Sequence, residues 1–183
     1  MSVSEKFEQL NHASRAMAEN CFLDCCGSRR WARMMVEARP FADATALLQQ
    51  AEQIWQSLEP QDWLEAFAAH PKIGARQAAP QPPAQSAEWS HAEQSGTHTA
   101  TDSVRHALAE ANCLYEEKFG YIFIVCATGK SAEEMLALCR QRVHNAADLE
   151  LRIAANEQRK ITEIRLRKLF ECGWAENSGG ERR

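Results

Sequence analysis

The chain has 183 residues, which is enough for one compact domain with a sizeable hydrophobic core. Hydrophobic residues make up 45% of it and charged residues 25%, the usual mixture for a soluble globular protein. A formal net charge of -4 gives no broad electrostatic attraction to nucleic acid or to an anionic membrane, so we expect neither as a partner.

The cysteines and the two ends of the chain bear on its cellular location. Seven cysteines occur at irregular spacing, which is typical of reduced, mostly buried thiols in a chain without a secretion signal. The first residues lack the basic start and apolar run of a signal peptide, and no stretch is long enough to cross a bilayer. The last three residues are not a peroxisomal address. We therefore expect a cytoplasmic protein.

Most of the chain has the spacing of apolar residues that is typical of helices. Asp43 is placed to cap a helix, and Pro60 opens the next one. Ser131 and Glu134 match a capping box at the start of a later helix. Helices are predicted over residues 4–8, 13–21, 29–37, 44–57, 60–70, 102–119, 131–144 and 148–170.

Two segments interrupt the helical pattern. Residues 76–90 are rich in proline, so they are predicted to form an exposed loop, either an insertion or a cover over the site. Tyr121–Cys126 resembles a strand, but one strand cannot make a sheet, so we expect a short, extended, buried connector. The predicted fold is all-α, a single-domain multihelical bundle over residues 1–172 with a mobile tail at 173–183.

His70 is the first candidate catalytic residue. A helical pattern leads up to it, and Pro71 biases His70 away from helical angles, so the helix is expected to end there. An imidazole at a helix end can reach a ligand in a cleft, and it titrates near neutral pH, which suits proton transfer. The alternative is a structural histidine whose positive charge stabilises the C-terminal end of the helix.

Glu93 has two interpretations. The four residues from Ser90 to Glu93 match a capping box, in which both side chains bond backbone amides that begin a helix. From the residues alone, capping is the favoured interpretation. The start of a helix is also a good place to hold an anion, so a role in binding is compatible with capping.

Arg165 lies in an apolar stripe of the last predicted helix, because Ile161, Arg165 and Leu169 are spaced four residues apart. An arginine in such a stripe either extends along its stem to water or grips an anion with its fork of donors. Arg167 points elsewhere on the helix and is our second choice for an anion-binding arginine.

The segment Phe119, Gly120, Tyr121 and Ile122 is a candidate pocket wall. Its side chains can enclose a flat ring while backbone amides and carbonyls bond the edge of that ring, and Pro71 can pack against the same ligand. The alternative is a buried core segment. The histidines and cysteines lack metal-ligand spacing, so we expect no metal.

Several motifs follow one another in a recognisable order. They are CCGSRRWA at residues 25–32 with RPF at 39–41, HPKIG at 70–74, SHAEQSG at 90–96, KFGYIFI at 118–124 and KITEIRL at 160–166. Taken together, from about Leu10 to Leu169, the chain resembles the 2-oxo-4-hydroxy-4-carboxy-5-ureidoimidazoline (OHCU) decarboxylases of urate breakdown.

The resemblance implies a carboxy-lyase that converts OHCU to (S)-allantoin without a cofactor, and it suggests a homodimer. It implies that His70 takes part in proton movements, that Glu93 is essential, and that Arg165 is the essential arginine. The implied substrate-binding residues are Pro71, Ser90, Phe119, Gly120, Tyr121 and Ile122. Two alternatives are an enzyme for another small, planar, nitrogen-rich acid and a helical interaction module that has lost catalysis.

Overall fold

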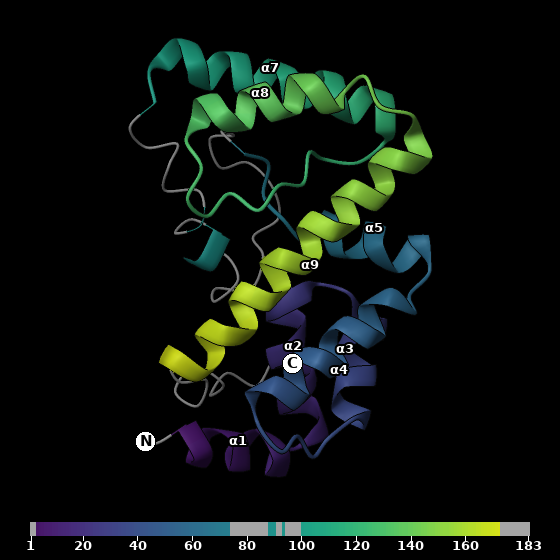
Figure 1. The fold of residues 1–183 in the computed structure, drawn as a ribbon, viewed down its shortest axis with the longest axis vertical. Coiled ribbons are helices and arrows are strands. Elements are labelled where there is room, and N and C mark those ends of the chain that lie inside the picture. The colour runs from purple at the N-terminus through teal and green to yellow at the C-terminus, as the bar shows by residue number, and fades with distance from the viewer. Residues whose placement is uncertain (1–2, 74–87, 91–92, 94–99, 173–183) are drawn as a thin grey trace. The chain divides into compact units, whose positions relative to one another are not determined.

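The computed structural model describes residues 3–73, 88–90, 93 and 100–172 (Figure 1). Regular secondary structure in these ranges is helical, with no strand among them, which confirms the all-α prediction. The principal helices are α1 (Val3–His12), α2 (Arg15–Cys26), α3 (Arg29–Glu37), α4 (Ala44–Gln56), α5 (Pro60–Ala68), α7 (Asp102–Phe119), α8 (Ala132–Arg142) and α9 (Ala147–Cys172).

The chain groups into two compact units. The first unit comprises Met1–Asp62 and Arg159–Arg183, and the second comprises Trp63–Gln158. Helix α9 begins in the second unit and continues into the first. The single domain predicted over residues 1–172 stays a prediction, and the predicted tail at 173–183 lies outside the described residues.

In the first unit, α2 continues beyond its predicted end at Cys21. No helix breaker follows Cys21 until Gly27, which ends α2 in the left-handed conformation with φ of 86°. Phe22 is fully buried on the continuing helix and makes an edge-on contact with Trp31 of α3, with ring centroids 5.9 Å apart. Burial of Phe22 therefore stabilises the extra turns that the sequence pattern had not indicated.

Helix caps in both units follow the predicted signals. The carboxylate of Asp43 accepts a hydrogen bond from the Ala46 amide at 2.9 Å, which begins α4 as expected. Ser131 and Glu134 form the predicted capping box, with the two reciprocal bonds at 3.2 and 2.7 Å. These local bonds explain why the starts of α4 and α8 could be located from sequence.

In the second unit, α7 and α8 pack side by side over a connector that is neither helix nor strand (Figure 1). Gly120 ends α7 with φ of 77°, as predicted. Phe123, Val125 and Ala127 are buried in one core cluster with residues of α7 and α8. Alternate residues of an extended chain point to opposite sides, so the connector places one side in this core. The predicted buried connector is confirmed.

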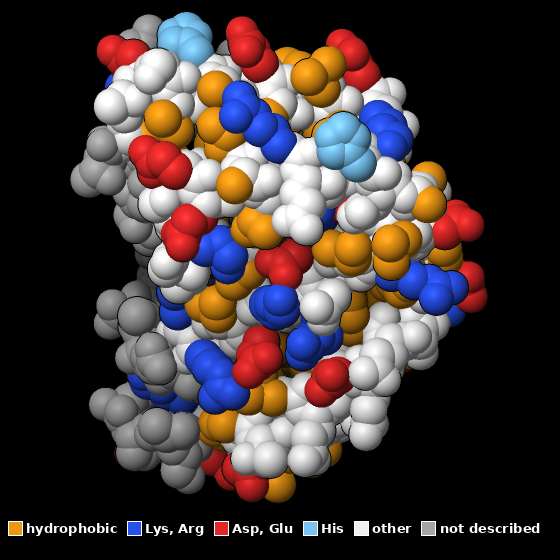
Figure 2. All heavy atoms as spheres, turned by 45° about the horizontal axis from the view of Figure 1, so that its top comes forward, with side chains coloured by type: hydrophobic (Ala, Val, Ile, Leu, Met, Phe, Trp, Pro, Cys, Tyr) orange, Lys and Arg blue, Asp and Glu red, His pale blue; other side chains and the backbone are white. Residues whose placement is uncertain are grey.

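The described helices include none that is long and apolar enough to cross a membrane. On the face drawn in Figure 2, acidic and basic side chains are interspersed rather than gathered by sign. This mixed face fits the small net charge of the chain.

Candidate active site

His70 lies just beyond the C-terminal end of α5. The helix ends at Ala68, and the His70 amide donates to the Phe67 carbonyl at 3.1 Å in a final turn. Pro71 follows at once, and the His70 side chain is partly buried. The predicted helix end is therefore confirmed, and the imidazole occupies a defined position on the scaffold.

The residues after His70 are fixed to α7. Lys72 forms an ion pair with Glu116 at 2.6 Å, and the Asn112 side chain donates to the Ile73 carbonyl at 3.4 Å. The Ile73 side chain is buried in the α7–α8 core cluster. Because the segment is held both at α5 and at α7, the backbone around His70 has little freedom to shift.

Ser90 and Glu93 both have helical backbone. Residues 88–90 and residue 93 are helical, Ser90 is 4% exposed and Glu93 is partly buried. Ser90 follows two helical residues, so it lies inside the helix and cannot be its N-cap. The capping interpretation was therefore wrong, because the helix begins before the motif. The last three residues of the predicted loop at 76–90 are helical, and residues 76–87 lie outside the described ranges.

The side chains of Phe119 and Tyr121 belong to an aromatic cluster. The Tyr121 ring lies 5.4 Å from Phe67, 5.9 Å from Tyr115 and 6.0 Å from Phe119, measured between centroids. Both side chains pack against the core cluster and are partly buried. These aromatic side chains thus have a packing role, whatever their backbone groups bind. Gly120 is exposed and Ile122 is partly buried.

Cys126 lies in a charged environment at the end of the connector. Burial raises the pKa of its thiol, the positive charge of Lys130 opposes that rise, and the carboxylates of Glu157 and Glu93 add to it. The Cys126 amide donates to Glu157 at 2.8 Å, and its carbonyl accepts from Lys130 at 2.7 Å. Two side chains of opposite charge therefore hold the backbone at the end of the connector.

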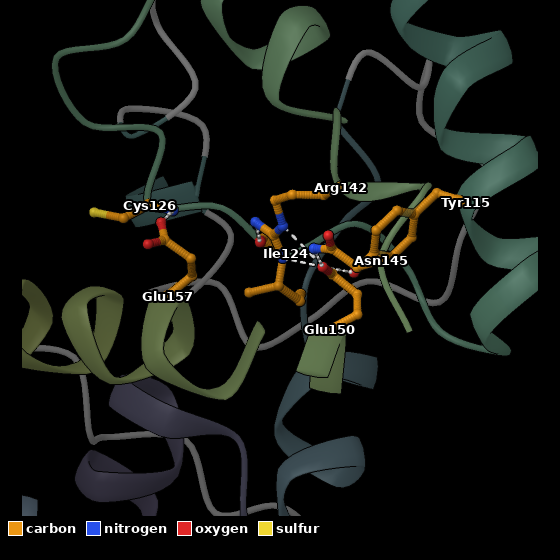
Figure 3. Close-up of polar contacts among 7 residues, drawn as sticks. All are labelled: Tyr115, Ile124, Cys126, Arg142, Asn145, Glu150 and Glu157. Carbon is orange, nitrogen blue, oxygen red and sulfur yellow. Dashed lines mark hydrogen bonds and ion pairs between the residues drawn. The ribbon is translucent and has the colours of Figure 1, made fainter. Parts of the chain in front are cut away.

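A buried ionic network supports the middle of the connector (Figure 3). The Arg142 guanidinium donates to Glu150 and, through Nη1, to the Ile124 carbonyl at 2.9 Å. Glu150 also accepts hydrogen bonds from the Tyr115 hydroxyl and from the side-chain Nδ2 of Asn145. Burial, followed by the bond to Glu150, raises the pKa of Tyr115. The buried Arg142–Glu150 pair therefore has several hydrogen-bond partners, and these bonds offset the cost of burying its two charges.

Arg165 is buried in the first unit, where it is 3% exposed. Its neighbours along the predicted stripe, Ile161 and Leu169, are buried as well. The Nη1 atom donates to the Asp24 carbonyl of α2 at 3.4 Å, and its charge opposes the burial-driven rise in the pKa of Cys25. Arg165 therefore does not extend to water, which removes one of its two predicted interpretations.

Arg167 differs from Arg165 in its exposure and its partners. Its side chain is 56% exposed and pairs with Glu163 one turn earlier at 2.8 Å. It also lines a cavity of about 300 Å³ in the first unit, whose lining includes Trp55 and Leu166 but not Arg165. The choice of Arg165 over Arg167 as the anion-binding arginine therefore stays a prediction.

The second unit holds most of the predicted site residues. It contains His70, Pro71, Ser90, Glu93 and the segment 119–122, whereas Arg165 belongs to the first unit. Sequence reasoning missed Glu157, Arg142 and Glu150, which hold the connector. A buried charge pair carries no local sequence signal, although a glutamate close before the KITEIRL motif could have been noted. Among the described residues, no group of His, Cys, Asp and Glu is arranged to hold a metal.

Comparisons with known proteins agree on one family. A family model described as OHCU decarboxylase matches residues 11–167. The chain is 45% identical over 150 residues to the uric acid degradation bifunctional protein TTL of Arabidopsis thaliana, covering 80% of this chain and 45% of that protein. It is 26% identical over 135 residues to a 2-oxo-4-hydroxy-4-carboxy-5-ureidoimidazoline decarboxylase of Haloferax volcanii, covering 73% and 76% of the two chains.

Solved structures give the same answer. A crystal structure of OHCU decarboxylase in the presence of (S)-allantoin matches with a TM-score of 0.71 and 40% identity, covering 82% of this chain and 96% of that one. A crystal structure of (S)-allantoin synthase, 17% identical, shares the fold with a TM-score of 0.66 over 92% of this chain and 54% of that one. The chain spans less than half the length of the bifunctional relatives it matches. By its sequence and its fold, this chain belongs to the OHCU decarboxylase family.

Proposed function

We propose that this protein decarboxylates OHCU to (S)-allantoin, a step in urate degradation. The observation that carries the proposal is the 40% identity to a solved OHCU decarboxylase, almost all of whose chain is matched and whose crystals were studied with (S)-allantoin. The additional length of the bifunctional relatives carries no part of the proposal.

The reaction needs no external electron sink. In OHCU the carbon that carries the carboxylate also carries a hydroxyl and adjoins a carbon doubly bonded to nitrogen. When the carbon–carbon bond to the carboxylate breaks and carbon dioxide leaves, its electron pair moves toward that nitrogen. The ring nitrogen that receives the pair takes up one proton, which gives an enol-like intermediate. This intermediate gains a proton at the ureido-bearing carbon while the hydroxyl loses its proton and becomes the carbonyl of allantoin, so the reaction takes up one proton overall. We therefore propose a cofactor-free reaction.

His70 and Glu93 are proposed to act on the substrate hydroxyl and to position the carboxylate for loss. His70 is suited to this role because its imidazole follows a fixed helix end, and histidine is the residue type most often used for proton transfer in enzymes. Glu93 is suited because it is partly buried and its carboxylate can accept the proton of a substrate hydroxyl. Ser90 and Pro71 complete this part of the proposed site.

Arg165 is proposed to hold an anionic or carbonyl oxygen of the substrate, since a guanidinium fork bonds such groups in a fixed geometry. Backbone groups of Gly120, Tyr121 and Ile122 are proposed to bond the ring edge, and Phe119 to pack near it. Fixed geometry at the protonation step is the enzyme's main contribution, because OHCU also decays without enzyme, to racemic allantoin.

We also propose that the protein acts in the cytoplasm and as a homodimer. The seven cysteines fit a reducing compartment, and the family resemblance suggests the dimer. Size-exclusion chromatography with light scattering tests the dimer directly: a mass of twice 20.6 kDa is expected, and the monomer mass contradicts it.

The test of the activity follows the disappearance of OHCU by its ultraviolet absorbance. OHCU is generated freshly from urate with urate oxidase and hydroxyisourate hydrolase. The expected result is an initial rate proportional to the concentration of this protein. Decay at the rate without protein, from a folded sample, would contradict the proposal. A panel of other planar, nitrogen-rich acids then tells whether OHCU is the preferred substrate.

A further inference from the structure

The connector between α7 and α8 is held by side chains rather than by a sheet. Arg142 donates to the Ile124 carbonyl at 2.9 Å, and Glu157 accepts from the Cys126 amide at 2.8 Å (Figure 3). Lys130 adds a bond of 2.7 Å to the Cys126 carbonyl. An extended segment that pairs with no strand depends on such bonds, because its backbone groups lack ladder partners.

The two sides of the connector have different surroundings. Phe123, Val125 and Ala127 are members of the core cluster, and Tyr121 packs against that cluster. The alternating residues, which include Ile122 and Cys126, are not part of the cluster and point to the other side of an extended chain. Ile122, whose backbone is proposed to bond the substrate, belongs to this other side.

Glu157 holds the backbone at the end of the connector. It is a partly buried residue of α9, and its carboxylate oxygen accepts the Cys126 amide in a charge-assisted hydrogen bond. Arg142 forms a buried ion pair with Glu150 in the interior of the second unit. Glu157 instead connects α9 directly to the backbone at the end of the connector.

We propose that Glu157 is a positioning residue for the reaction: by accepting the Cys126 amide, it holds in place the connector whose residues Tyr121 and Ile122 are proposed to bond the substrate. This inference rests on the proposed decarboxylase function. In this role Glu157 does not contact the substrate. It acts through the backbone of the connector.

Replacement of Glu157 by methionine and by glutamine separates positioning from charge. Methionine keeps the length of the side chain and a good helix propensity but has no strong acceptor. A displacement of about 1 Å in a site can reduce the rate about a hundredfold, so we expect Glu157→Met to lower kcat by roughly tenfold to a hundredfold with KM little changed. The optical purity of the allantoin should fall as well, because facial selectivity depends on the same geometry.

Glutamine restores an oxygen acceptor without a charge. If positioning is the role, Glu157→Gln should keep kcat within about threefold of the wild type, since a neutral hydrogen bond is about half as strong as a charge-assisted one. A loss with glutamine equal to that with methionine would overturn the inference, because it would show that the charge of Glu157, rather than the bond to Cys126, is required.

Backbone hydrogen exchange measured on peptides that cover residues 121–127 reads the same bond without any turnover. The Cys126 amide should exchange faster in Glu157→Met than in the wild type, and at a near-normal rate in Glu157→Gln. Glu163→Ala is the matched control, because Glu163 is a glutamate of the same helix whose closer partner, Arg167, is at the surface, with Arg159 more distant at 3.8 Å. It should leave kcat, optical purity and exchange unchanged.

Unchanged kcat and product purity in a folded Glu157→Met protein would overturn the inference, as would unchanged exchange at Cys126. Lys130→Met removes the other bond to Cys126 and decides the matter if Glu157→Met does not fold: lowered kcat at constant KM supports positioning, and unchanged kcat overturns it. An inactive wild-type protein contradicts the proposed function instead, and the exchange measurement still tests the connection between Glu157 and Cys126.

Discussion

The Nε and Nη2 atoms of Arg142 both donate to one oxygen of Glu150, at distances of 2.8 and 2.5 Å. Glu150 is fully buried and Arg142 is 8% exposed on its side chain. The guanidinium also lies 4.7 Å from the centre of the Phe123 ring. One charge pair therefore connects the end of α8, the start of α9 and the connector within the second unit.

Loss of one member of this pair should be strongly destabilising. We expect Glu150→Ala to lower the free energy of unfolding by about 3–5 kcal/mol, because it leaves the buried Arg142 charge without its carboxylate. The surface pair of Arg167 and Glu163 is the control, and Glu163→Ala should cost less than about 1 kcal/mol. Urea unfolding of both variants measures the difference, and equal losses would contradict this view of the network.

The buried thiols should be unreactive in the folded protein. Burial raises the pKa of Cys21 from 9.0 to about 12, with Asp24 adding to the rise, and burial raises that of Cys139 to about 11. Cys113 is exposed on α7. Among the described cysteines, we expect an alkylating reagent at pH 8 to label Cys113 first, as mass spectrometry of digests would show. Early labelling of Cys21 or Cys139 would contradict the structure.

The same shifts predict how stability changes at alkaline pH. A thiol whose pKa is raised by folding keeps its proton in the folded state while the unfolded chain loses it. The stabilisation is therefore complete below about pH 8.5 and declines as pH rises toward 11 to 12. Denaturant titrations between pH 7 and 10.5 should show a falling unfolding free energy above pH 9, and Cys139→Ala should reduce the slope. An equal slope in Cys139→Ala and in the wild type would contradict the raised pKa of Cys139.

Arg165 and Arg167 offer a direct test of which guanidinium the reaction requires. Arg165→Lys keeps the charge but replaces a planar fork by a point charge, so we expect kcat/KM to fall at least about tenfold. Arg167→Lys changes a side chain that is 56% exposed and paired with Glu163, and should leave kcat/KM within about twofold. Steady-state kinetics on OHCU measures both, and the reverse ranking would assign the role to Arg167.

The helix starts could be predicted because caps act over a few residues. Asp43 and Ser131 bond amides three residues ahead, so the sequence carries the whole signal. The end of α2 was misplaced because the stabilisation beyond Cys21 comes from Phe22, whose burial depends on another helix. The local sequence pattern could not locate a helix end that is decided by tertiary contacts.

The candidate site was predicted only in part for a similar reason. His70 could be found because a histidine before a proline at a helix end is a local pattern. Ser90 was misread as a cap because the two residues before it gave no sign of being helical already. Glu157 and Arg142 act on the connector across more than fifteen residues, so their roles depend on the packing of α8 and α9 rather than on spacing.

His70 should be essential for activity but not for folding. It is partly buried at the end of α5, so replacement by glutamine disturbs little packing. We expect His70→Gln to lower kcat by at least about a hundredfold, the usual contribution of general acid–base catalysis, with a thermal midpoint close to that of the wild type. Thermal unfolding and OHCU turnover are measured on the same sample, and an active variant would remove His70 from the mechanism.

Circular dichroism of freshly generated OHCU, recorded with and without this protein, tests the central claim most directly. It reports turnover and stereocontrol in one trace. We predict rapid formation of an optically active product with the signature of (S)-allantoin when the protein is present, and a racemic mixture when the protein is omitted. Slow decay to racemic allantoin in the presence of folded protein would contradict the decarboxylase assignment.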